Sequence, residues 1–81
     1  MSVRSTIESQ MQQVAFEHGR TLAALTDELK LLESGLDSLS FAIIVARLED
    51  LLGIDPFSSG DSVPLPVTFG DFVRMYENFR R

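Results

Sequence analysis

Apolar side chains recur at helical spacing near the start of this chain, and their spacing predicts an amphipathic helix. The repeated residues follow one another at steps of four and three: Val3, Ile7, Met11 and Val14. Ser5 and Glu8 have the spacing of a capping box. We therefore expect a first helix from about Ser2 to His18, with the imidazole of His18 at the negative end of the helix dipole.

The middle of the chain carries both a helix start and a helix stop. Asp37 is a favoured N-cap residue and Gly53 stands where a left-handed residue ends a helix. The stretch from Ser38 to Leu52 is therefore predicted to be one helix. At about 100° per residue, six of its apolar residues gather on a broad side that we assign to the core. These residues are Phe41, Ile44, Val45, Leu48, Leu51 and Leu52.

The opposite side of this central helix carries three further apolar residues, which we call the apolar stripe: Leu39, Ile43 and Ala46. The stripe is rimmed by Ala42, Arg47, Glu49 and Asp50. An apolar surface that faces solvent is typical of a docking site for a partner protein. A helix buried on all sides is the alternative that the pattern leaves open.

A third periodic stretch lies near the C-terminal end of the chain. Thr68 and Asp71 have capping spacing, and four large residues follow at i, i+3, i+4 and i+7: Phe69, Phe72, Val73 and Tyr76. This pattern predicts a last helix that ends near Asn78. Its aromatic residues are expected to form part of the core, since core packing is the commoner meaning of such a pattern.

The segments between these helices have no sustained period. From Arg20 to Leu36 we expect a long loop held to the bundle by five leucines: Leu22, Leu25, Leu29, Leu31 and Leu32. Residues 58–66 are rich in Ser, Gly and Pro, so at most one short helical turn is expected there, anchored by Phe57, Val63 and Leu65. The predicted fold class is therefore all-α.

Length and charge narrow the class of protein. With 81 residues, the chain is expected to form a single domain over 1–81. The net charge is −5, and eight acidic residues against two basic ones lie between Asp27 and Asp61. This charge argues against nucleic acid and anionic membranes as partners and favours basic ones. The absence of cysteine and of an apolar N-terminal run leads us to expect a cytoplasmic location without a signal peptide or membrane anchor.

Ser38 is the residue with the clearest chemical potential. In the first turn of the predicted helix, its hydroxyl would lie near unpaired backbone N–H groups and the positive end of the helix dipole, a place that tolerates a phosphodiester. The chain lacks the Gly-x-Ser-x-Gly pattern of a nucleophilic serine, and its one histidine, His18, is far away in sequence. No cluster of metal-ligating residues accompanies it. We expect Ser38 to be modified by another enzyme and the chain to be no enzyme itself.

The sequence Gly35-Leu36-Asp37-Ser38-Leu39, followed by an apolar helix and by Gly53-Ile54, resembles the acyl carrier protein family and its peptidyl-carrier relatives. The resemblance covers nearly the whole chain. It implies a monomeric four-helix bundle with a long first loop and a short or irregular third helix. It also implies that Ser38, flanked by Asp37 and Leu39, carries 4′-phosphopantetheine, whose thiol holds acyl or aminoacyl groups as thioesters. The implied partners are a phosphopantetheinyl transferase, an acyl- or aminoacyl-activating ligase, and downstream synthase or transferase enzymes.

The chain departs from the general fatty-acid carriers, which usually have several carboxylates along the second helix. The residues expected to face partner enzymes here are Ala42, Ile43, Ala46, Glu49 and Asp50. Three of these are apolar, which favours a dedicated carrier in a specialised acyl, polyketide or aminoacyl pathway. The cargo stays open. A second hypothesis from another class is an unmodified interaction module that binds a partner helix or groove through the apolar stripe.

Overall fold

The computed structural model of the protein describes residues 2–56 and 65–79. Within these residues the elements are α1 (Val3–Glu17), the 3-10 helix η1 (Leu31–Glu33), α2 (Ser38–Leu52) and α3 (Phe69–Phe79). The one β interaction among them is an isolated bridge between Lys30 and Thr68. The predicted all-α class is confirmed. The short helical turn expected within residues 58–66 lies mostly outside the described residues, and the two described residues of that range, Leu65 and Pro66, belong to no helix.

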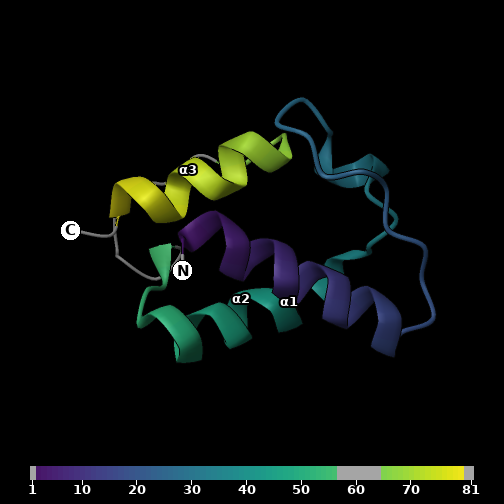
Figure 1. Ribbon diagram of the computed structural model, residues 1–81, viewed down its shortest axis with the longest axis horizontal. Helices are drawn as coiled ribbons and strands as arrows, with labels where there is room; N and C mark the ends of the chain where they lie inside the picture. The colour runs from purple at the N-terminus through teal and green to yellow at the C-terminus, as the bar shows by residue number, and fades with distance from the viewer. Residues whose placement is uncertain (1, 57–64, 80–81) are drawn as a thin grey trace.

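Helix α1 is the central element of the bundle, because it packs against both α2 and α3 (Figure 1). Its four predicted apolar residues are all buried. The N-cap is Ser2, whose hydroxyl accepts a hydrogen bond from the backbone N–H of Ser5 at 3.0 Å. The capping interpretation of Ser5 and Glu8 is therefore wrong, since Ser5 already lies inside the helix. The expected extent from Ser2 to His18 is confirmed, with His18 as the C-cap.

Helix α2 begins and ends where the sequence predicts. The carboxylate of Asp37 accepts the N–H of Ser40 at 2.8 Å, and Gly53 has the left-handed φ of 70°. The N–H of Gly53 donates to the carbonyl of Glu49 at 2.8 Å. Both ends of the helix are thus stabilised by the local signals that predicted them.

The assignment of faces on α2 needs two corrections. Ile44 and Leu48 are fully buried as predicted, but Leu51 is 57% exposed and lies at the surface beside the polar side chains of Gln10 and Gln13 of α1. Ile43 was expected to face solvent; it is half-buried and packs against the core. The buried face of α2 also includes Ser40 and extends to Ile43, so the apolar stripe is exposed only at Leu39 and Ala46.

The long loop between α1 and α2 is held in place by the packing of its leucines and by backbone hydrogen bonds. Leu22, Leu25 and Leu29 pack against the core and Leu31 is buried, as predicted. Leu32 is 96% exposed, because the tight turn of η1 directs neighbouring side chains to different sides. The prediction that Leu32 holds the loop to the bundle is therefore wrong.

Backbone hydrogen bonds tie this loop to the start of α3. The N–H of Leu31 donates to Val67 at 2.9 Å, and the N–H of Phe69 donates to Leu29 at 2.7 Å. Together with the bridge between Lys30 and Thr68, they hold the segment that leads into α2 alongside residues 67–69. Residues 67–69, which lie far from Ser38 in sequence, therefore help to fix the backbone that leads into α2.

Helix α3 packs its predicted aromatic face into the core, where Phe69, Phe72, Val73 and Tyr76 are at most 2% exposed. Its start has a reciprocal cap, in which Asp71 N–H donates to the Thr68 hydroxyl and Thr68 N–H donates to the Asp71 carboxylate. Leu65 is 78% exposed, so its predicted role as a core anchor is wrong. The anchors expected at Phe57 and Val63 lie outside the described residues.

Candidate functional site

Ser38 is an exposed residue at the first position of α2, as predicted. The backbone on either side of it is fixed. Leu36 is buried, and the carboxylate of Asp37 caps the helix. Gly35 has a φ of +99°, and a Cβ atom at that position would collide with the backbone carbonyl of Thr21. Ser38 is therefore exposed to solvent at a fixed helix start. The residues that lead into this helix pack against the earlier part of the same loop, at Thr21.

The carboxylate beside Ser38 uses both of its oxygens. Asp37 Oδ1 accepts the N–H of Ser40, and Asp37 Oδ2 accepts from Arg20 Nη2 at 2.7 Å. The backbone N–H of Ser40 above all, then the Ser40 side chain and the charge of Arg20, hold the pKa of Asp37 below its usual range. Asp37, the residue before Ser38, thus keeps its negative charge at neutral pH.

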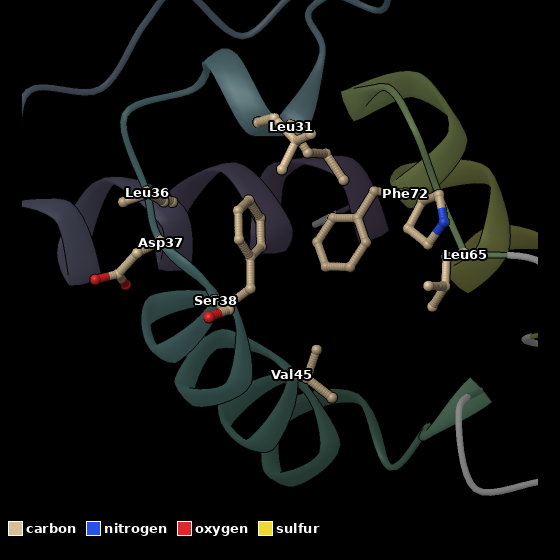
Figure 2. A pocket seen from close by; sticks show the side chains of 10 residues that line it. Leu31, Leu36, Asp37, Ser38, Val45, Leu65 and Phe72 are labelled. Atoms are coloured by element: carbon tan, nitrogen blue, oxygen red, sulfur yellow. The ribbon is translucent and has the colours of Figure 1, made fainter.

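A pocket of about 490 Å³ opens beside Ser38 (Figure 2). Its walls come from η1, the start of α2, α3 and the residues that precede α3: Leu31, Leu32, Leu36, Asp37, Ser38, Phe41, Val45, Leu65, Pro66 and Phe72. Ser38 and Asp37 supply the polar side chains at one edge, and Leu65 lies at the opposite edge. The other lining side chains are apolar. The pocket can therefore hold a hydrocarbon group attached close to Ser38.

The pocket explains where two unexpectedly exposed leucines lie. Leu32 and Leu65 both line it, so these side chains form part of its rim although neither is a core residue. Phe41 and Phe72 meet edge to face inside it, with ring centroids 6.1 Å apart, and join α2 to α3. The sequence did not reveal the pocket, because its walls are contributed by segments far apart along the chain.

The one histidine of the chain lies near the start of α2. His18 Nδ1 lies 3.4 Å from the hydroxyl of Ser40, the fully buried serine of the same turn. No group of three or more His, Cys, Asp or Glu side chains suited to a metal ion occurs within 2–56 and 65–79.

The residues predicted to face partner enzymes belong to α2, and none of them lines the pocket. Ala42, Ala46, Glu49 and Asp50 are exposed, whereas Ile43 is half-buried. Leu39, next to Ser38, is 64% exposed. The exposed residues form a surface of mixed apolar and acidic character. Their role in partner binding stays a prediction.

None of the helices in the described part of the chain has the length and apolar character to cross a membrane. Comparisons with protein-family models, curated proteins and solved structures found no match to this chain.

Proposed function

We propose that this protein is a carrier that holds acyl groups as thioesters on a 4′-phosphopantetheine arm attached to Ser38. The observation that carries the proposal is the position of Ser38, an exposed hydroxyl on a capped helix start at the edge of an apolar pocket. An exposed serine at such a place accepts a phosphodiester without burying its charge. The surroundings of Ser38 therefore fit the group that the family resemblance implies.

Attachment would use Ser38 as the acceptor. Its hydroxyl oxygen forms a bond to the β-phosphorus of coenzyme A, the pyrophosphate bond at that phosphorus breaks, and adenosine 3′,5′-bisphosphate leaves. The hydroxyl proton would pass to a base of the phosphopantetheinyl transferase. When bound, the group would supply the thiol on which acyl groups are carried. Loading and use of the cargo then depend on an activating ligase and on downstream synthase or transferase enzymes.

The lining of the pocket favours an acyl chain over an amino acid as cargo. Its walls are apolar apart from Ser38 and Asp37 at one edge, so an ammonium group deeper in the pocket would lose water without gaining a partner. Each methylene group that leaves water for such walls contributes about 0.8 kcal/mol. We therefore propose a fatty or polyketide acyl group as the cargo.

The attachment is tested by intact mass. Incubation with a phosphopantetheinyl transferase and coenzyme A should add one phosphopantetheine group to the protein and none to Ser38→Ala. The Ser38→Ala variant should keep the circular dichroism of the parent, because Ser38 is exposed and the cap comes from Asp37. Modification of Ser38→Ala at another serine would contradict the assignment. If the unsubstituted protein gains no mass with several transferases, the carrier proposal is overturned.

The cargo is tested by thermal melts of the modified protein loaded with acyl groups of increasing length. The melting temperature should rise with chain length until the pocket is full. Val45→Phe, which narrows the pocket, should remove this rise, whereas Val67→Phe is a matched control because Val67 is exposed and does not line the pocket. A melting temperature that is independent of chain length would count against the acyl cargo.

The interaction-module hypothesis is decided by the same mass measurement. A module of that kind needs no modification of Ser38, and it would bind its partner through the apolar stripe. The half-burial of Ile43 leaves Leu39 and Ala46 as the accessible part of that stripe. Protein isolated from its own host in wholly unmodified form would favour this second hypothesis.

A further inference from the structure

The end of α1 brings a basic side chain to the turn that carries Ser38. The N–H of Arg20 donates to the carbonyl of Ala15 at 2.8 Å, and the N–H of Gly19 donates to Phe16 at 3.2 Å. These two bonds are those of a Schellman motif, so the backbone of Arg20 belongs to the rigid end of the helix. The side chain of Arg20 therefore reaches α2 from a backbone position that is fixed to the end of α1.

Arg20 contributes little to the cap of α2 itself. Its Nη2 lies 2.7 Å from Asp37 Oδ2, while the cap is made by Asp37 Oδ1 and the N–H of Ser40. The two side chains of the ion pair are 43% and 44% exposed. Exposed pairs of this kind stabilise a fold weakly. The weak contribution of this ion pair to stability leaves Arg20 available for a role besides folding.

Modification of Ser38 changes the balance of charge at this turn. A phosphodiester there adds a negative charge on the residue next to Asp37, and the two like charges repel each other. A guanidinium has five N–H donors in a planar fork that suits phosphate oxygens, and Asp37 takes one of them. One arginine can therefore serve both anions.

We infer that Arg20 is the residue that holds the phosphodiester of modified Ser38, bridging it to Asp37. Arg20 is thus a positioning residue for the arm, fixing the direction in which it leaves α2. The inference rests on the proposed function. It adds to that function a residue outside the Gly35-Leu36-Asp37-Ser38-Leu39 motif.

A matched control exists in the same protein. Arg47 forms an ion pair with Glu17 at the same distance of 2.7 Å and with comparable exposure, 34% and 38%. This pair joins α1 to α2 away from the first turn of α2. Arg47 Nη1 makes a second, longer contact to Glu17 at 3.4 Å. Arg20→Ala and Arg47→Ala therefore each remove one exposed ion pair to α1 or its C-terminal end, and only the first of these pairs adjoins Ser38.

The experiment compares melting temperatures of the unmodified and phosphopantetheine-bearing forms of each protein at low salt. Arg20→Ala should lower the melting temperature of the modified form by about 2–4 °C more than that of the unmodified form. Arg47→Ala should lower both forms equally, and Arg20→Lys should recover part of the difference because it keeps the charge but not the fork. At 1 M salt the difference should shrink, since exposed charges are screened.

A second readout is the phosphorus-31 resonance of the arm, which a purely structural ion pair would leave unchanged. It should move in Arg20→Ala and in Arg20→Gln, and stay in place in Arg47→Ala. If Arg20→Ala lowers the melting temperature of the modified and unmodified forms equally and the phosphorus-31 resonance does not move, the role of Arg20 is overturned while the carrier function stays intact. Failure of the unsubstituted protein to accept the arm at all would overturn both.

Discussion

Gly35→Ala tests whether the start of α2 is held by the first loop. In the native backbone Gly35 has a φ of +99°, and a Cβ there would lie 3.2 Å from the carbonyl carbon of Thr21 and closer still to its oxygen. Gly53 provides the matched control, because it also has a positive φ, +70°, but nothing lies within 4 Å of its added Cβ. The two substitutions share the conformational cost, and Gly35→Ala adds a collision with backbone.

The magnitudes follow from these two contributions. A left-handed alanine costs about 1–2 kcal/mol, which we expect for Gly53→Ala. Displacing the Thr21 backbone adds roughly 1–3 kcal/mol, the usual cost of forcing extra atoms into a packed site. Gly35→Ala should thus destabilise the domain by about 2–5 kcal/mol. That is a large share of the roughly 4–12 kcal/mol expected for 81 residues.

Urea unfolding followed by far-ultraviolet circular dichroism measures both changes. The unfolding midpoint should fall much further for Gly35→Ala than for Gly53→Ala, and the helix content of folded Gly53→Ala should equal that of the parent. If the two free energies of unfolding agree within about 0.5 kcal/mol, the spread expected for ordinary surface changes, the close approach of Gly35 to Thr21 is not what holds the start of α2.

Three further predictions concern the surface of α2, the helix caps and a buried hydroxyl. Ala42→Glu should leave the thermal melt within about 0.5 kcal/mol of the parent yet slow loading by the activating ligase, whereas Ile43→Glu should destabilise the fold by burying part of a charge; melts and loading rates of both variants check this. Capping hydrogen bonds hold the pKa of Asp37 and of Asp71 below the usual aspartate value, so both carboxylates stabilise the fold above pH 4 and lose this contribution as the pH falls through their lower folded values. Thermal melts between pH 6 and pH 2 check this, since each limit is about two units from the ordinary pKa of 3.9. As the pH falls, the melting temperature should decline less steeply for Asp37→Asn than for the parent, because asparagine keeps a capping oxygen and does not titrate. Tyr76→Phe removes a buried hydroxyl that has no hydrogen-bond partner among the described residues, and it should leave the free energy of unfolding unchanged or raise it by up to about 1 kcal/mol in urea titrations.

Local signals in the sequence were sufficient to predict α2. Asp37 and Gly53 act on the residues immediately beside them, so the bounds of the helix and the exposure of Ser38 followed from the chain alone. The same holds for α3, where Thr68 and Asp71 cap each other. Capping depends on residues that are neighbours in sequence, and the order of the amino acids is enough to identify them.

Features that depend on contacts between distant segments were not predicted. The side of α2 that is buried depends on where α1 lies, and for this reason Ile43 and Leu51 were placed wrongly. The pocket requires Leu65 to come near Ser38 from the other end of the chain. Gly19 is a typical residue after a helix end, so the sequence could have indicated that the backbone of Arg20 is fixed to α1. The ion pair between Arg20 and Asp37 could not be predicted in this way, because it is a tertiary contact.

The backbone pairing of residues 29–31 with 67–69 has a consequence for sequence divergence. Hydrogen bonds between main-chain atoms do not depend on side chains, so exposed loop residues such as Ala24 and Glu28 are free to change while the loop stays docked. Selection on this loop then falls on its buried leucines and on Gly35, where backbone meets backbone. Proteins with the same backbone pairing beside α2 are therefore expected to share few loop residues beyond these.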